Sequence, residues 1–347
     1  MKLNQYASPA AFFAANRLAA NANRPFIDKN GEPCVFVNQN GKPVKMRANA
    51  ALLRYDEWKD IDRQVIGIAT QRLTGIADLV GRGLTHNLGG LGVSMSLWQS
   101  SSDLTEANVS MSGGTSGEED SVAFNTNQVP VPIIHKDFRL DIRRLEASRR
   151  HGEALDTLTA SIAARVVAEK SEDMLFAGLP IQVEGNTIYG YTTFPGRVTV
   201  DMGTPWDQLT PEQNGQIVEE VNAMLAAARA NRYYGPFVLY IPGNYEGKLD
   251  EDYRSAGDQR TLRERIMALN GISEIKVADR LEGDNVILVQ MTKDVIDLAI
   301  GQDITTIQWV TMGGMVEHFR VMACWAPRLK SDFDNHAGIV HLSTSTT

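Results

Sequence analysis

The chain has 347 residues, of which 43% are hydrophobic and 22% charged, and its net charge is −8. This composition is typical of a folded globular protein. No apolar run approaches the ~18 residues of a membrane span. The first residues also lack the basic start and apolar block of a secretory signal, so we expect a protein without a membrane partner that stays in the cytoplasm. The negative net charge argues against a protein that binds nucleic acid over a broad surface.

The first part of the chain, residues 1–50, predicts an arm and not a domain. The Ala-rich stretch Ala10–Ala22 predicts a short helix. Cys34–Val37 is an apolar run between turn signals at 29–31 and 39–43, which predicts a strand in a hairpin. The two cysteines, Cys34 and Cys324, are far apart and too few for a cysteine metal cage, so we expect neither a structural disulfide nor such a site.

A helical pattern covers residues 53–84 and ends at Gly81 and Gly83. Apolar residues recur there at three- and four-residue steps, as in Trp58, Ile61, Val65 and Ile68, and again in Leu73, Ile76 and Leu79.

The segment 87–134 predicts a long two-stranded hairpin. Residues alternate on either side of a turn at Ser112–Gly117, as in Val93, Met95 and Leu97 or in Val122 and Phe124. The segment has no Lys or Arg but has five acidic residues: Asp103, Glu106, Glu118, Glu119 and Asp120. Two strands alone are marginal in water, so the hairpin must lie on another surface. The alternative is a disordered loop.

The strand Ile134–Ile142 leads into a long helix predicted over residues 152–178. Leu155, Leu158, Ile162 and Val166 form one apolar row, and the apolar side then moves to Ala163, Val167 and Met174. One interpretation is a core helix that rotates as it crosses a domain. The other is a spine helix that contacts more than one subunit.

A compact α/β unit is predicted over residues 204–314. Thr210-Pro211-Glu212-Gln213 is a capping box that starts a helix to about Ala230. A buried strand (Phe237–Ile241), a helix (260–269) and three short strands (275–277, 286–290 and 295–300) follow. The strand Met315–Trp325 should return to the earlier region, and Thr344–Thr347 is a polar tail.

No catalytic constellation is present in the sequence. Ser116 lacks the spacing of a nucleophile elbow, the six histidines are scattered, and no carboxylate pair has an apolar setting. We therefore expect no enzyme activity, no cofactor and no metal. One basic cluster stands out: Arg139, Arg143, Arg144, Arg149 and Arg150. It could meet phosphates, pair with acids of a neighbouring molecule, or form a solvated face.

The order of these parts resembles the tailed-bacteriophage major capsid protein fold (Hong Kong 97-type), an α+β fold, and is most similar to its encapsulin branch. The matching stretches are LRYDEWKDID, the run from Phe138 through RRHGEALDT to SEDMLFAG, YGPFVLYIPGNYEGKL, TLRERIMALNGI and LAIGQDITTIQWV. The resemblance implies an N-terminal arm (1–52), a helical segment of the peripheral domain (53–86), an extended loop (87–134), a peripheral domain with the spine helix (135–203), an axial domain (204–314), and a return strand with tail (315–347).

The resemblance also implies a function. It predicts a major capsid protein that self-assembles as hexamers and pentamers into an icosahedral virion shell around phage double-stranded DNA. Predicted partners are a separate scaffolding protein, a portal, a decoration protein and non-specifically bound DNA, with assembly in the host cytoplasm. Candidate contact residues between subunits are Trp98, Ser112, Gly113, Gly114, Ser116, Glu118, Glu119, Arg143, Arg144, Arg149 and Arg150. The alternative is an encapsulin-type compartment that holds an enzyme; the extra residues before Leu53 favour a phage capsid.

Overall fold

The structure is a computed structural model, and it describes residues 25–28, 32–39, 42–47, 55–102, 111, 121–141, 143, 150, 158–253, 260–312 and 316–344. The predicted helix Ala10–Ala22 lies outside these residues. The chain forms two compact units. The first unit contains Met1–Ser94, Val131–Leu175 and Leu298–Ala326, and the second contains Met95–Pro130, Phe176–Asp297 and Pro327–Thr347. No described helix is long and apolar enough to cross a lipid bilayer.

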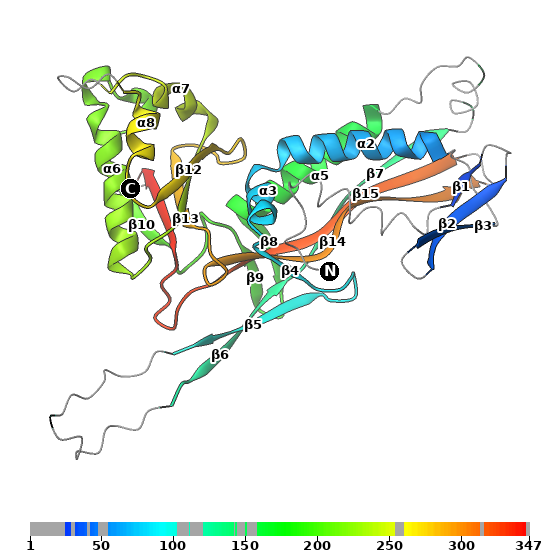
Figure 1. Cartoon of the computed structure of the whole chain (residues 1–347), viewed down its shortest axis with the longest axis horizontal. Coiled ribbons are helices and arrows are strands. Elements are labelled where there is room, and N and C mark those ends of the chain that lie inside the picture. The colour runs from blue at the N-terminus through cyan, green and yellow to red at the C-terminus, as the bar shows by residue number, and fades with distance from the viewer. Residues whose placement is uncertain are drawn as a thin grey trace. The chain divides into compact units, whose positions relative to one another are not determined.

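The described part of the first unit combines two sheets with helices (Figure 1). Its elements are β1 (Pro25–Ile27), β2 (Pro33–Gln39), β3 (Lys42–Arg47), α2 (Tyr55–Arg72), α3 (Thr74–Gly81), β4 (Thr85–Asn87), β7 (Ile133–Asp141), α5 (Leu158–Phe176) and most of β14 (Ile296–Thr311) and β15 (Val316–Leu329). Strands β1, β2 and β3 form an antiparallel sheet, which confirms and extends the hairpin predicted around Cys34–Val37. The larger sheet has the order β4-β14-β15-β7.

One face of this larger sheet packs against helices. Phe138 of β7 lies directly opposite Phe319 of β15, and their rings stack with centroids 5.0 Å apart. Trp58 of α2 meets Phe319 edge-on at 5.9 Å. Because side chains alternate along a strand, the neighbouring residues of β7 and β15 point to the opposite face. The predicted return of the last apolar strand is confirmed, since β15 pairs with β7 from Val316↔Asp141 to Cys324↔Ile133.

The helical segment predicted over residues 53–84 is two helices, α2 and α3. Leu73 separates them with a non-helical backbone (φ −89°, ψ 83°). The α3 N-terminus has no side-chain cap of its own. Instead, the Glu172 carboxylate of α5 accepts hydrogen bonds from the backbone N–H groups of Gly75 and Ile76 at 3.1 and 3.0 Å. A residue almost one hundred positions away thus stabilises the start of α3.

The long helix is confirmed over its described part, and its two predicted apolar rows differ in burial. Ala163, Val167 and Met174 are buried. Leu158, Ile162 and Val166 are exposed, as in the interpretation of a helix that contacts more than one subunit. In the first half of the helix the buried side includes Ala160, Ala163, Ala164 and Ala168, whose small side chains allow close packing against neighbouring elements. Gly178 follows the helix with a positive φ of 82°, as a C-terminal glycine should.

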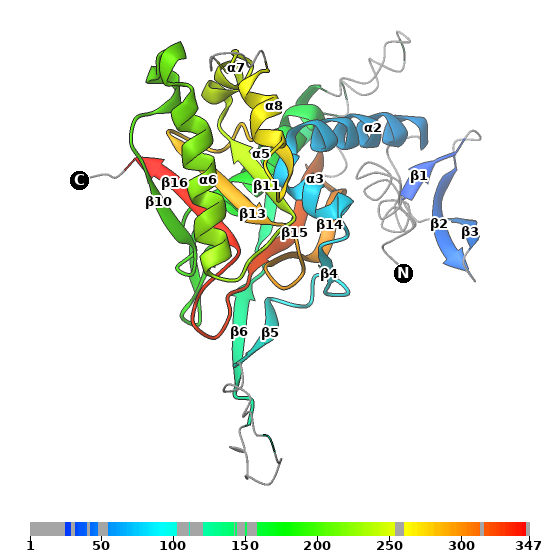
Figure 2. The same ribbon diagram turned by 60° about the vertical axis from the view of Figure 1, so that its left-hand side comes forward.

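The second unit contains a mixed five-stranded sheet with the order β10-β16-β13-β11-β12. Its elements are β5 (Met95–Ser101), β6 (Phe124–Pro130), β8 (Gly178–Val183), β9 (Asn186–Tyr189), β10 (Val198–Met202), α6 (Gly215–Ala230), β11 (Phe237–Ile241), α7 (Glu246–Leu249), α8 (Leu262–Met267), β12 (Ile272–Val277), β13 (Asn285–Gln290) and β16 (Ile339–Thr344), with 3-10 turns at Trp206–Gln208, Pro211–Gln213 and Gly243–Tyr245. Figure 2 shows α6 lying across this sheet.

The core of the second unit follows the predicted α/β pattern. Ile217, Val221, Met224 and Leu225 of α6 are buried as expected, and all five residues of β11 are buried. The capping box at Thr210–Gln213 is confirmed, although it starts a 3-10 turn that precedes α6. Strands β10 and β16, from the predicted segments 135–203 and 315–347, also lie in this sheet. The strand predicted at 295–300 is much longer, and most of it lies in the first unit.

Candidate assembly surface

The predicted hairpin is formed by β5 and β6 of the second unit. The two strands are antiparallel, with Met95 opposite Pro130 and Ser101 opposite Phe124. In Figures 1 and 2 the hairpin extends away from the five-stranded sheet. Residues 103–110 and 112–120, which contain the predicted turn, lie outside the described residues.

The hairpin has an inner and an outer face. Ser96 and Val129, which face each other across the strands, are buried on the inner face. Leu97 and Phe124 point to the outer face, where they are 58% and 69% exposed. The apolar alternation of the sequence therefore marks the face that this chain leaves uncovered. Exposed apolar side chains on a rigid two-stranded element indicate a contact surface for another molecule.

A buried ion pair fixes the base of the hairpin. The Arg328 guanidinium donates two hydrogen bonds to the Asp297 carboxylate, both at 2.5 Å, and the Lys330 ammonium donates a third at 2.8 Å. Arg328 also donates to the Ser96 hydroxyl and the Leu97 carbonyl of β5, at 3.4 and 3.5 Å. The side chains of Arg328 and Asp297 are each only 6% exposed.

The electrostatics of this cluster favour its charged form. Burial acts to raise the pKa of Asp297, but the hydrogen bonds and charges of Arg328 and Lys330 outweigh it, so the pKa lies below its usual value. The bidentate geometry also fixes the orientation of the guanidinium plane. The base of β5 is thereby held by the charged cluster of its own unit.

The predicted contact residues fall in different places. Trp98 lies on the inner face of the hairpin, half-buried, with the Arg328 guanidinium 5.9 Å from its ring centroid. Arg143 and Arg150 are exposed residues of the segment between β7 and α5. The others lie outside the described residues: Ser112, Gly113, Gly114, Ser116, Glu118, Glu119, Arg144 and Arg149.

Sequence reasoning missed a second surface, on the first unit. We define the open sheet face as the side of β14, β15 and β7 opposite Phe138 and Phe319. Arg320 forms a bidentate pair with Asp137 there, at 2.6 and 2.7 Å, directly across β15 and β7. The hydrogen bonds of Arg320 are the main cause that lowers the pKa of Asp137 below its usual value. The cross-strand register that makes this pair was not visible in the sequence.

An aromatic stack continues the open sheet face toward the end of β14. The Trp309 ring lies parallel to the His318 ring with centroids 5.4 Å apart, and the Arg320 guanidinium lies 5.4 Å from the Trp309 centroid. The Thr311 hydroxyl and the His318 Nε2 atom are 2.8 Å apart. Cross-strand and cation–π contacts of this kind order a sheet face before any partner binds.

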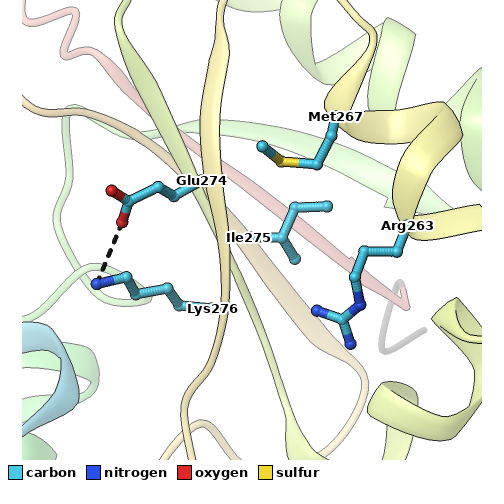
Figure 3. A pocket seen from close by; sticks show the side chains of 5 residues that line it. All are labelled: Arg263, Met267, Glu274, Ile275 and Lys276. Atoms are coloured by element: carbon cyan, nitrogen blue, oxygen red, sulfur yellow. Dashed lines mark ion pairs between the residues drawn. The ribbon is translucent and has the colours of Figure 1, made fainter.

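The described residues offer little for small-molecule chemistry. They contain no group of three or more His, Cys, Asp or Glu side chains placed to hold a metal ion. Figure 3 shows one hollow in the second unit, lined by Arg263, Met267, Glu274, Ile275 and Lys276. Its charged residues Lys276 and Glu274 pair with each other at 3.2 Å and are partly exposed.

Comparison with known proteins matches most of the chain. Residues 47–342 match the model of a family of unknown function, DUF6260. The chain is 26% identical over 283 residues to the type 1 encapsulin shell protein EncA of Myxococcus xanthus (strain DK1622), covering 80% of this chain and 90% of that protein.

Two solved structures share the fold. The virus-like particle protein of Pyrococcus furiosus is 19% identical with a TM-score of 0.58, covering 82% of this chain and 99% of that one. The capsid protein of Myoviridae Phage XM1 is 12% identical with a TM-score of 0.59, covering 78% and 92%. The predicted Hong Kong 97-type fold is thereby confirmed, and the chain belongs to the DUF6260 family.

Proposed function

We propose that this chain is a structural subunit that assembles with copies of itself, as hexamers and pentamers, into a closed icosahedral shell. The observation that carries the proposal is the outer face of the β5–β6 hairpin, where Leu97 and Phe124 are exposed on an element fixed at its base by Arg328. The fold shared with capsid and encapsulin shell proteins supports the same function.

The open sheet face of a second copy is the surface that we propose for the hairpin. This face presents Trp309 and the cations Arg139 and Arg320, whereas the segment 87–134 has no Lys or Arg and five acidic residues. Apolar side chains would meet the aromatic stack, and the Arg139 cation would face the acidic hairpin segment, whereas Arg320 is already paired with Asp137. Complementarity of this kind favours one docking orientation over others.

Substitutions on the outer face test this contact. We expect the Leu97→Asp/Phe124→Asp variant to lower the yield of particles at least ~10-fold, because two charges would be buried without partners on docking. The matched control is Leu97→Met/Phe124→Leu, which keeps the apolar surface and should assemble normally. Particle yield is measured by sedimentation and negative-stain microscopy. Normal assembly of the double Asp variant would refute the hairpin contact.

For the contents of the shell we propose phage double-stranded DNA, with a virion location. The β1–β3 sheet supports this choice because it belongs to the N-terminal part that encapsulins, which start close to the α2 position, usually lack. A separate scaffolding protein, a portal, a decoration protein and non-specifically bound DNA would then be its partners.

The second candidate is an encapsulin-type compartment that holds a cargo enzyme. The similarity to the shell protein of Myxococcus xanthus, which covers 90% of that protein, favours it. The contents of particles purified from the native source discriminate between the two. Nuclease-protected DNA would support the phage capsid, and a stoichiometric second protein without DNA would support the compartment. Both candidates make the role of this chain structural and not enzymatic.

A further inference from the structure

The outward side of α5 carries an exposed apolar row. Leu158, Ile162 and Val166 follow each other at four-residue steps and are 64%, 45% and 39% exposed. The opposite side of the same helix, with Ala164 and Val167, is fully buried. A helix of a folded domain normally exposes polar residues on its outward side. The row therefore has the character of a contact surface.

The row has defined limits. From Leu158 to Val166 it is about 12 Å long, at ~1.5 Å per residue. At its C-terminal end the row meets two ion pairs on the outward side of the helix: Arg165 with Glu169 at 3.8 Å, and Lys170 with Asp173 at 3.9 Å. An apolar strip of two turns that ends in charged residues fits one short amphipathic helix packed alongside.

The chain itself provides a segment of this kind. Twenty-four residues precede β1, and their stretch Ala10–Ala22 has helix-forming alanines with the large apolar residues Phe12, Phe13 and Leu18. The segment Met1–Arg24 contains three cationic residues and no Asp or Glu, so it brings no carboxylate next to Glu169, which is paired with Arg165 at the end of the row.

The segment also starts from a suitable place. It joins β1 at Pro25, and β1 contacts α2. Helices α2 and α5 lie next to each other in Figures 1 and 2, and the first turns of α5 lie toward the same end of the first unit as β1. Asn23 and Arg24 join the predicted helix Ala10–Ala22 to β1 and add ~7 Å of reach when extended, at ~3.3 Å per residue.

We propose that the segment Met1–Arg24 docks as an amphipathic helix on the row Leu158–Ile162–Val166 of the same chain. This contact is independent of the proposed shell function and can be measured on assembled or unassembled protein. A second copy's segment and a separate protein are the other possible occupants of the row, and the experiment below distinguishes them.

Disulfide trapping in the full-length chain tests the contact. We expect Phe13→Cys/Ile162→Cys to form an intrachain disulfide under mild oxidation, visible as a faster-migrating monomer on a non-reducing gel. Its yield should exceed that of the control Phe13→Cys/Lys170→Cys at least ~5-fold, because position 170 lies ~12 Å along the helix beyond Ile162. The native Cys34 and Cys324 are buried, and each single variant measures their background.

Two results would overturn the proposal. An interchain dimer would assign the row to a second copy's segment, and yields equal to the control would remove the contact. Hydrogen exchange provides an independent measurement. Amides of residues 10–22 should exchange at least ~10-fold more slowly than in an unfolded chain, and Ile162→Lys should abolish this protection while the exposed control Thr159→Lys keeps it. Unprotected amides in the unmodified chain would leave the row to a separate protein.

Discussion

At the scale of single residues, Glu172 links α5 to α3. Its carboxylate is buried and caps the α3 N-terminus through the N–H groups of Gly75 and Ile76. Burial is the main cause that raises the pKa of Glu172 from 4.5 to about 8, against the opposing effect of the two hydrogen bonds. The folded chain thus takes up a proton there at pH values where an unfolded chain has lost it.

This shift predicts a pH-dependent stability. Between pH 4.5 and about 8 the folded state binds more protons at Glu172 than the unfolded state, so the free energy of unfolding falls as pH rises. The loss is of the order of 5 kcal/mol above pH 8. Denaturant titrations of the unassembled subunit should show this slope, and Glu172→Gln should remove it while keeping an acceptor for one of the two N–H groups. Identical slopes in both proteins would contradict the assignment.

The Arg328–Asp297 pair predicts a large stability effect. Arg328→Met leaves the buried Asp297 carboxylate with Lys330 as its remaining cation and should lower the free energy of unfolding by about 3–5 kcal/mol. The control is Arg263→Met, whose partner Asp250 is mostly exposed and whose loss should cost less than about 1 kcal/mol.

The double variant Arg328→Met/Asp297→Leu distinguishes the cost of an unpaired Asp297 carboxylate from the cost of losing the packing of Arg328. Removing both buried charges should recover much of the lost stability, because no unpaired carboxylate remains. Equal costs for the single and the double variant would mean that the packing of Arg328 matters and its charge does not.

At the scale of elements, periodicity identified the apolar faces of α5 and of the hairpin but did not show which of them the chain itself covers. Leu158, Ile162 and Leu97 are apolar and exposed, whereas the alanines of α5 and Ser96 are buried. Residue type alone could not distinguish a face covered within the chain from one available to another molecule. The resemblance in the order of elements was sufficient for the fold.

Contacts between residues far apart in the chain were the other feature that could not be predicted from the sequence. The short run Ile339–Thr344 falls in the predicted segment 315–347, yet β16 lies between β10 and β13 in the five-stranded sheet of the second unit. The Arg320–Asp137 pair depends on the β15–β7 register, and the Glu172 cap depends on α5 lying beside α3. Each joins positions far apart in the chain, so no local pattern indicates it.

We expect the predicted turn of the hairpin, Ser112–Gly117, to be required for assembly but not for the stability of the subunit. Deleting Ser112–Gly117 should leave the thermal unfolding midpoint of the subunit within about 2 °C, because the buried part of the hairpin starts at Ser96 and Val129. The same deletion should reduce particle formation, because the tip would contact a neighbouring copy. Calorimetry and microscopy of the same preparation check both results. Normal particles would show that the tip is dispensable.

At the scale of the whole molecule, we expect a shell held without covalent bonds between subunits. Some capsids of this fold join subunits through a lysine on the extended loop, but the segment 87–134 has no lysine, and the next one, Lys136, lies in β7. Particles boiled in detergent should release the chain at its monomer mass of 38.2 kDa. Multimers that survive boiling and reductant would contradict this expectation.

The most direct test of the assembly account is a cryo-electron microscopy reconstruction of particles formed by the full-length chain, with scaffolding protein supplied if needed. The account predicts a closed icosahedral shell in which Leu97 and Phe124 of one copy contact the open sheet face around Trp309 of a neighbour. A chain that remains monomeric under all conditions, or a shell in which the outer hairpin face is bare, would contradict it.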